Sequence, residues 1–275
     1  MQHRGHRLSV LTLAVAVGAL SLALTTPSQP AHETYRALRG ADDKPDLNGI
    51  WQALGTAHWD IEGHAARPGP ILELGALGAI PAGMGVVEGR DIPYQPWAKA
   101  KKEENFENWL TADPAIKCYM PGVPRATYMP FPFQIVQTPE YILLAYEFAS
   151  STRVVYMNKP DFESPVDTWM GHSRGHWEGE TLVVDVTSQV PDTWFDSSGN
   201  FHSEAVHVVE RYTPVSPNAL MYEVTIEDPT VFTRPWKMRM PLYRRLDENM
   251  QLLEFKCVEF VEELMYGHLR KGASQ

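Results

Sequence analysis

Cysteine is nearly absent from this chain, with two residues in 275, and no long apolar run occurs after residue 24. A phosphate-binding loop, a dinucleotide fingerprint and a His-Glu-x-x-His motif are also missing. These absences argue against membrane spans in the body of the chain and against nucleotide- or zinc-dependent chemistry of the common kinds. We therefore expect no metal and no organic cofactor.

Basic residues are few as well. Lys and Arg number 24 against 34 Asp and Glu, and the net charge at pH 7 is −10. An acidic body repels nucleic-acid phosphates and anionic lipid head groups, so neither nucleic acid nor a membrane surface is an expected partner. With 44% hydrophobic and 21% charged residues the composition is globular, which leaves a small molecule as the expected partner. The oligomeric state stays open.

The N-terminal segment has the pattern of a secretory signal peptide. Arg4 and Arg7 precede the uncharged apolar run 8–24, and a small, polar stretch follows at residues 25–31. A retained membrane anchor is the alternative, because 17 apolar residues come close to the length that spans a bilayer. We expect cleavage near residue 31, and a secreted or periplasmic protein with no membrane attachment afterwards.

An exported protein changes the interpretation of the two cysteines. Cys118 and Cys257 are 139 residues apart, and an oxidising compartment favours a disulfide between them. Two buried free thiols are the alternative.

The remaining residues, 32–275, are expected to form a single domain. Residues 53–93 are rich in Gly and Pro and lack periodicity, which indicates a long wrapping loop. Residues 96–110 predict a helix that begins at a proline, and residues 258–270 predict a second helix packed on the outside.

Most of the chain after residue 132 alternates with the period of β-strands. Turn signals separate short β-branched segments, without amphipathic helices between them. The segments are 141–148, 152–157, 181–187, 205–212, 220–226, 236–240 and 252–257. The pattern predicts an all-β fold with minor α content, in which an antiparallel sheet forms a closed or nearly closed barrel. The Gly49-x-Trp51 pair resembles the opening of lipocalins, where the Trp closes one end of the barrel.

A second resemblance covers most of the chain after the signal segment. The chain resembles a family of uncharacterised bacterial secreted proteins in four longer motifs: PDLNGIW (45–51), CYMPGVPR (118–125), PFQIVQTP (132–139) and GHSRGHWEGETLVVD (171–185). Shorter matches are Thr193-Trp194, His202-Ser203, Glu210-Arg211 and Glu227-Asp228-Pro229. The family pattern ends with a short acidic tail after the last Cys, whereas this chain continues from Val258 to Lys271. The resemblance implies architecture and candidate positions rather than a reaction.

Candidate functional residues follow from strand parity, because one face of each strand of a closed barrel points into the lumen. Either the lumen is apolar and the strand charges face solvent, or the lumen holds paired charges. On the second interpretation a cavity with carboxylate, His and Arg groups binds and polarises a small organic molecule. The predicted substrate-binding residues are Glu147, His172, Trp177, Asp185, Trp194 and Tyr146.

Two functions remain open. The first is a cofactor-independent lyase, isomerase or hydrolase that acts on a small, partly aromatic substrate by general acid–base catalysis. The predicted catalytic residues are His202 as acid or base, Asp196 or Glu210 as its orienting group, and Arg153 or Arg211 as the group that holds a developing anion. The second is an exported barrel that only binds an apolar or aromatic ligand.

Two weaker alternatives involve the same strands. A carboxylate pair such as Glu210 with Asp185 would suit carbohydrate hydrolysis. The series His202, Glu204, His207 and Glu210 superficially resembles a metal-ligand set, but on a strand His207 would point away from the others.

Overall fold

The computed structural model describes residues 35–40 and 42–270. All of these residues belong to one compact unit, Thr34–Gln275. The expected signal peptide, residues 1–31, lies outside the described residues.

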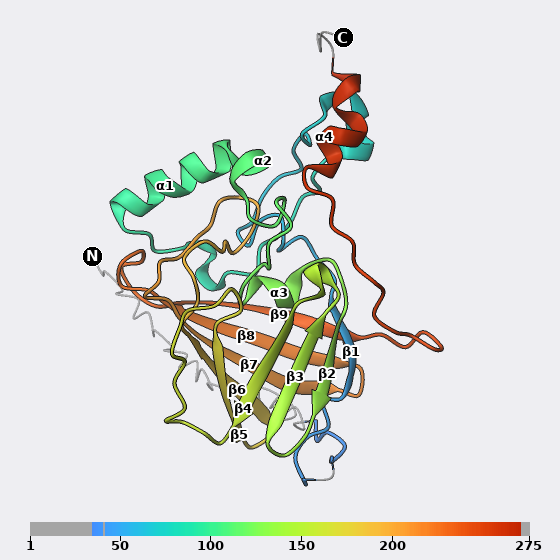
Figure 1. The fold of residues 1–275 in the computed structure, drawn as a ribbon, viewed down its shortest axis with the longest axis vertical. Helices are drawn as coiled ribbons and strands as arrows, with labels where there is room; N and C mark the ends of the chain where they lie inside the picture. The colour runs from blue at the N-terminus through green and yellow to red at the C-terminus, as the bar shows by residue number, and fades with distance from the viewer. Residues whose placement is uncertain (1–34, 41, 271–275) are drawn as a thin grey trace, which may run out of the picture. The chain divides into compact units, whose positions relative to one another are not determined.

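Nine strands form a closed barrel in the order of the sequence (Figure 1). They are β1 (Gly49–Ala53), β2 (Phe133–Gln137), β3 (Tyr141–Tyr146), β4 (Thr152–Met157), β5 (His172–Glu178), β6 (Thr181–Thr187), β7 (His207–Ser216), β8 (Ala219–Glu227) and β9 (Trp236–Arg244). The barrel closes where β1 pairs with β9. The prediction of an all-β, lipocalin-like barrel is therefore confirmed.

One strand pair departs from the expected antiparallel pattern. The β4–β5 pair is parallel, with Val155 opposite Ser173, whereas the other eight pairs are antiparallel. A parallel pair needs a connection that returns to the starting end of the first strand. Residues 158–171 make this connection. Residues 252–257, predicted as a last strand, are assigned to neither a strand nor a helix.

Alternating side chains fill the barrel interior. Leu144, Val155 and Met238 are among the buried residues of one continuous apolar cluster. Their strand neighbours of opposite parity, such as Leu143 and Val154, point outward and are partly exposed. The alternation of apolar and other residues in the sequence thus corresponds to side chains that point into and out of the barrel.

Trp51, the tryptophan of the Gly-x-Trp pattern, is buried near one end of the barrel, where it pairs with Arg244, the last residue of β9. Its ring is 1% exposed, and its Nε1 donates a hydrogen bond to the Leu47 carbonyl at 2.9 Å. The guanidinium of Arg244, from the last strand, lies 4.2 Å from the centre of the ring, a cation–π contact between the first and last strands. Loss of solvent lowers the pKa of Arg244.

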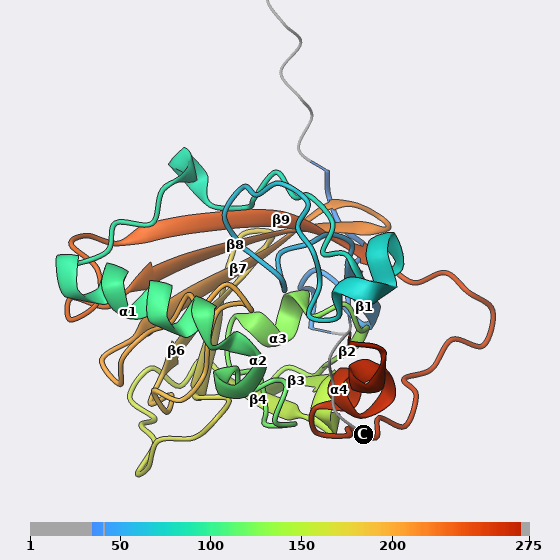
Figure 2. The same cartoon turned by 90° about the horizontal axis from the view of Figure 1, so that it is seen from above.

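The opposite end of the barrel is covered by what we call the loop layer, residues 54–132, 188–206 and 228–235. Its helices are α1 (Pro96–Glu107), α2 (Trp109–Ala112) and α3 (Arg125–Tyr128), with the 3₁₀ turns η1 (Leu72–Gly78) and η2 (Glu88–Arg90). Figures 1 and 2 show α1, α2 and α3 at this end of the barrel. The helix expected over 96–110 starts at Pro96 and is interrupted at Asn108. A further 3₁₀ turn, η3 (Phe148–Ser150), connects β3 to β4.

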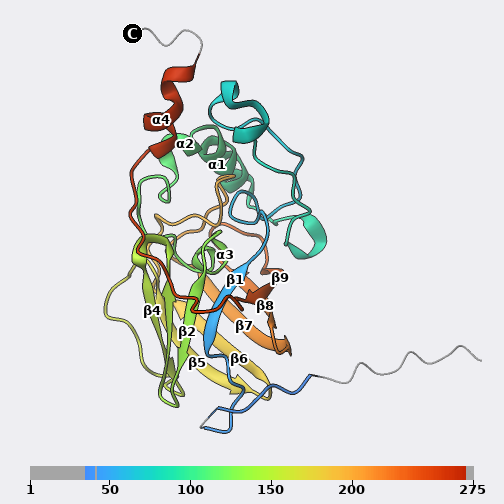
Figure 3. The ribbon, with the colours of Figure 1, turned by 90° about the vertical axis from the view of Figure 1, so that its right-hand side faces the viewer.

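The C-terminal segment is held by a disulfide between Cys118 and Cys257, which confirms the expected pairing. The Phe255 ring packs against Phe131 and Phe148, with ring centres 5.3 and 4.9 Å away. The last helix is shorter than the expected 258–270: α4 (Val261–Tyr266) continues into the turn η4 (Gly267–Leu269). Figure 3 shows α4 near η1, and Arg270 contacts the Pro70 carbonyl.

Within residues 35–40 and 42–270, none of the helices has the length and apolar character needed to cross a bilayer.

Candidate functional site

The predicted site residues separate into three places: the barrel interior, the barrel exterior and the loop layer. Arg153 and Glu210 lie in the interior, where Arg153 Nη1 is 2.6 Å from Glu210 Oε2. Glu210 Oε1 accepts hydrogen bonds from the hydroxyls of Tyr212 at 2.9 Å and Tyr222 at 2.5 Å. Burial raises the pKa of both tyrosines, and so does the nearby Glu210 charge. These contacts satisfy the Glu210 carboxylate.

Tyr146 belongs to the same interior cluster. Its hydroxyl lies 3.4 Å from Thr127 Oγ1, and its ring stacks at a tilt on Phe133. Both Arg153 and Glu210 are at most 3% exposed, and neither lines the two pockets described below. This buried cluster is a structural element of the barrel.

Four predicted residues lie outside the lumen, as the first of the two interpretations of the strand charges expects and contrary to the second. Arg211 pairs with Glu178 at 2.8 Å, and Asp185 lies 3.1 Å from His207 Nε2. The remaining two contact loops: His172 Nε2 lies 2.7 Å from the Phe162 carbonyl, and Glu147 accepts a hydrogen bond from the Leu253 N–H. Arg211, Asp185 and His172 occupy outward positions of their strands, because their neighbours along each strand are the buried, inward-facing residues. Glu147 lies just beyond the end of β3, so strand parity does not place it.

Because Arg211 and Asp185 face outward while Glu210 faces inward, two predicted arrangements do not form. Arg211 cannot hold an anion in the lumen, and Glu210 with Asp185 is no carboxylate pair for carbohydrate hydrolysis. Trp177 has inward parity and packs, partly buried, against the core. The series His202 to Glu210 is also divided, since His207 faces the exterior. In the described part of the chain no three His, Cys, Asp or Glu side chains are grouped as a metal site.

His202 is enclosed in the loop layer and is 2% exposed. Its Nε2 lies 2.6 Å from Thr193 Oγ1 and 2.9 Å from Gln189 Nε2, and its Nδ1 lies 2.8 Å from the Ser203 carbonyl. A neutral ring that carries its proton on Nδ1 donates to the Ser203 carbonyl, and its Nε2 lone pair is then the acceptor for the Thr193 hydroxyl and the Gln189 amide, which share it. Burial lowers the pKa of His202, which agrees with a neutral ring. The expected contacts with Asp196 or Glu210 are not formed.

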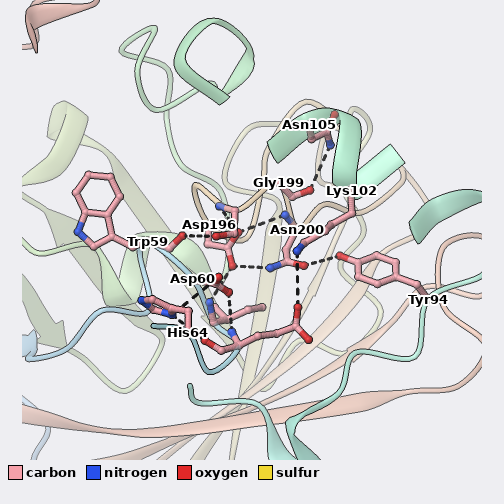
Figure 4. Close-up of polar contacts among 12 residues, drawn as sticks. Trp59, Asp60, His64, Tyr94, Lys102, Asn105, Asp196, Gly199 and Asn200 are labelled. Atoms are coloured by element: carbon pink, nitrogen blue, oxygen red, sulfur yellow. Dashed lines mark hydrogen bonds and ion pairs between the residues drawn. The ribbon is translucent and has the colours of Figure 1, made fainter. Parts of the chain in front are cut away.

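Asp196 lies in a loop whose residues 193–200 are all buried, Trp194 among them at 8% exposure. Its carboxylate accepts four hydrogen bonds: from the backbone N–H groups of Ile61 (2.8 Å), Ser198 (2.9 Å) and Asn200 (3.2 Å), and from Asn200 Nδ2 (2.6 Å). Asn200 in turn accepts a hydrogen bond from the Tyr94 hydroxyl (Figure 4). Through its hydrogen bond with the Ile61 N–H, Asp196 connects the segment 60–62 to the buried loop 193–200.

Asp60 is the functional candidate that the sequence-based interpretation missed. It precedes Ile61, so it lies next to the backbone N–H that Asp196 binds. Its side chain is 11% exposed, Oδ1 accepts the Glu62 N–H at 2.9 Å, and Oδ2 lies 3.9 Å from His64 Nδ1 (Figure 4). The Asp60 carboxylate therefore accepts fewer hydrogen bonds than the Asp196 carboxylate. Unlike Asp196, it also lines a pocket.

Two pockets meet at Asp60. The first, which we call the apolar pocket, has a volume of about 270 Å³ and is lined by Asp60 and by residues 53–57, 84–86, 239–241 and Tyr128. The second, which we call the charged pocket, has a volume of about 510 Å³ and is lined by Asp60, Glu62, Gly63, Met84, Arg90 and Lys102. Asp60 and Met84 line both pockets.

The electrostatics of this region are shifted by burial. Loss of solvent, followed by the negative charge of Asp60, raises the pKa of Asp196 from 3.8 to about 7, although the donors from Ile61 and Asn200 act in the opposite direction. Burial also raises the pKa of Glu62, against the effect of Lys102, whose Nζ is 3.9 Å away. The pKa of His58 falls to about 4 through burial and the Arg125 charge. A carboxyl that titrates near neutrality therefore lies directly behind the pockets.

A Gly-x-Ser-x-Gly sequence occurs at residues 171–175, but its surroundings are not those of a catalytic serine. Ser173 lies within strand β5 and is 1% exposed, and its Oγ has no hydrogen-bond partner among the described residues. A nucleophile elbow requires a sharp turn between a strand and a helix. The match has no such context.

Comparison with known proteins gives no identification. No family model, curated protein or solved structure matches the chain. The resemblance to bacterial secreted proteins thus stays a prediction, and the candidate site rests on geometry alone.

Proposed function

We propose that this protein is an exported, cofactor-independent enzyme that acts on a small, partly aromatic organic molecule by general acid–base catalysis. The observation that carries the proposal is the carboxylate of Asp60 at the junction of the two pockets, with Asp196 bound to the backbone N–H of the next residue. A carboxylate in the wall of a cavity, next to a buried group whose pKa is shifted, is typical of acid–base sites. Asp60 is the group that exchanges a proton with the substrate, and Asp196 is a positioning residue.

The division of roles follows from access. Asp196 is fully enclosed and its oxygens already accept four hydrogen bonds, which fills the acceptor capacity of a carboxylate. Asp60 lines both pockets, so it is the carboxylate of the two that a ligand can reach. Lyase, isomerase and hydrolase reactions all need such a group.

Export is part of the proposal. The basic and apolar N-terminal pattern supports a signal peptide. The Cys118–Cys257 disulfide supports an oxidising compartment, where such bonds persist. We propose that the protein is secreted or periplasmic, with a small molecule as its partner and neither nucleic acid nor membrane bound.

The test is turnover of a panel of aryl esters, aryl-substituted hydroxy acids and aryl ketones, with products detected by mass spectrometry. We expect Asp60→Asn to reduce turnover roughly 10²–10⁴-fold, the usual contribution of a general acid or base. Asp192→Asn is the matched control, because Asp192 is an exposed carboxylate outside both pockets. Full turnover in Asp60→Asn would contradict the proposal.

A protein that binds its ligand without turnover is the second candidate. The apolar wall of the first pocket favours it, because ligand sites are mostly apolar with a few polar groups. Panel members that bind the wild-type protein and are recovered unchanged would support this candidate over the enzyme.

A further inference from the structure

The wall of the apolar pocket leaves large apolar side chains in water. Leu54 is 67% exposed and Met84 is 89% exposed, and both line this pocket. Deeper in the wall, Ala57 and Met240 are 7% and 6% exposed. A ligand with an apolar part would cover Leu54 and Met84 and remove their surface from water.

The size of the pocket restricts that apolar part. An apolar cavity of about 150 Å³ is large enough to hold benzene. The apolar pocket, at about 270 Å³ and partly open to solvent, has room for one six-membered ring with a substituent.

The chemistry of the wall favours an aromatic ring over an alkyl group. Met84 and Met240 line the pocket, and methionine thioethers make favourable contacts with aromatic rings. Arg239 lines it as well, and guanidinium groups stack on aromatic faces. Tyr128 adds an aromatic residue to the lining, and its hydroxyl is already satisfied by the Phe195 carbonyl at 2.7 Å.

We propose that the apolar pocket binds a single aromatic ring, and that the ring carries an oxygen or nitrogen substituent directed toward Asp60. The inference rests on the proposed function for the choice of site, and it names the substrate class: monocyclic aromatic compounds with a polar substituent. Asp60 is the only acidic residue in the lining of this pocket, so the substituent that meets it is the group that exchanges a proton.

Phenol is the probe, with cyclohexanol as the non-aromatic analogue and 1-naphthol as the two-ring analogue. Binding to the full chain is measured by isothermal titration calorimetry and by saturation-transfer NMR. We expect phenol to bind in the millimolar range and more tightly than either analogue. Leu54→Glu should weaken phenol binding roughly tenfold, because the variant places a charge against the ring.

Leu77→Glu is the matched control. Leu77 is 94% exposed and lies outside both pockets, so the same substitution there should leave phenol binding unchanged. Because both leucines are exposed, neither variant should unfold the protein. Equal phenol binding in the two variants, absence of phenol binding to the wild-type protein, or equal affinity for cyclohexanol or 1-naphthol would each overturn the inference.

The two proposals fail in different experiments. Asp60→Asn keeps the apolar wall, so it should retain phenol binding while it loses turnover. Phenol binding at this wall without turnover of any panel member would contradict the enzyme and leave the ring site intact. Turnover that depends on Asp60, with no phenol binding, would contradict the ring site alone.

Discussion

Asp60 and Asp196 are side chains of the same type in different surroundings. Asp196 is surrounded by four donors and excluded from water, whereas Asp60 has one backbone donor and a face on each pocket. Burial removes water from the charged form of the Asp196 carboxylate, and this loss of solvation favours the protonated carboxyl. Position, rather than residue type, therefore divides the two roles.

The raised pKa of Asp196 predicts a pH dependence of stability. Its pKa is about 7 in the folded protein and near 3.8 in the unfolded chain, so the folded state binds the proton more tightly. The contribution of this group to stability is complete below the unfolded value and is lost as the pH rises toward 7. Urea denaturation between about pH 5 and pH 8 should show this loss in the wild-type protein, on the order of a few kcal/mol.

Asp196→Asn should remove that decline. The variant will also be less stable at every pH, because an amide cannot accept all four hydrogen bonds. The readout is therefore the pH slope of the free energy of unfolding, with the exposed Asp192→Asn variant as the reference. Titrations of His58 and His202 affect all three proteins alike and cancel in the comparison. Equal slopes in Asp196→Asn and wild type would contradict the assignment.

The role of Asp60 could not be predicted from the sequence, because Asp60 lies in a loop and strand parity gives no position for its side chain. Alternation places side chains on a face only inside a strand, and the sequence around Asp60 predicts a loop. One signal was present: Asp60, Glu62 and His64 recur at alternate positions directly after Trp59. Loops at the end of a rigid scaffold often carry functional residues, so these three polar side chains are candidates for a site.

At the level of strands, the period of two correctly predicted the barrel, but it left open which charged residues face its interior. The alternation could not show whether Arg153 faces the interior or the solvent, although it lies on the same face of its strand as the buried Val155 and Met157. The side chain is tolerated there only because Glu210, 57 residues later, faces it from another strand. Long-range pairing of this kind leaves no local trace in the sequence. The parallel β4–β5 pair was missed for the same reason.

The interior pair predicts a large effect of Arg153→Met. Loss of Arg153 leaves the Glu210 carboxylate buried without its counter-charge, which typically costs about 3–5 kcal/mol. The control is Arg211→Met, which breaks an exposed pair with Glu178 and should cost about 1 kcal/mol or less. The measurement is the free energy of unfolding in urea.

The double variant Arg153→Met/Glu210→Met completes the cycle. We expect it to be more stable than Arg153→Met alone, because no unpaired charge remains inside the barrel. Equal destabilisation by Arg153→Met and Arg211→Met would show that the interior pair contributes no more than a surface pair.

At the level of the whole molecule, the disulfide connects two parts that the barrel does not hold together. Cys257 lies in the C-terminal segment beyond β9, and Cys118 lies in the loop layer between Asp113 and Arg125. The Arg125 guanidinium donates two hydrogen bonds to the buried Asp113 carboxylate, at 2.7 and 2.8 Å. Apart from the disulfide, the C-terminal segment is fastened mainly by Phe255 and by a few hydrogen bonds.

Removal of the disulfide should therefore lower stability without removing the pockets. A cross-link that closes a loop of this length contributes about 5 kcal/mol on the chain-entropy account, so Cys118→Ser/Cys257→Ser should unfold at markedly lower urea concentration than the oxidised wild type. Reductant should destabilise the wild-type protein and leave the variant unaffected. Phenol binding should survive in the folded variant, because neither cysteine lines a pocket. Identical unfolding of oxidised and reduced wild-type protein would show that the barrel and loop layer hold the C-terminal segment without the covalent link.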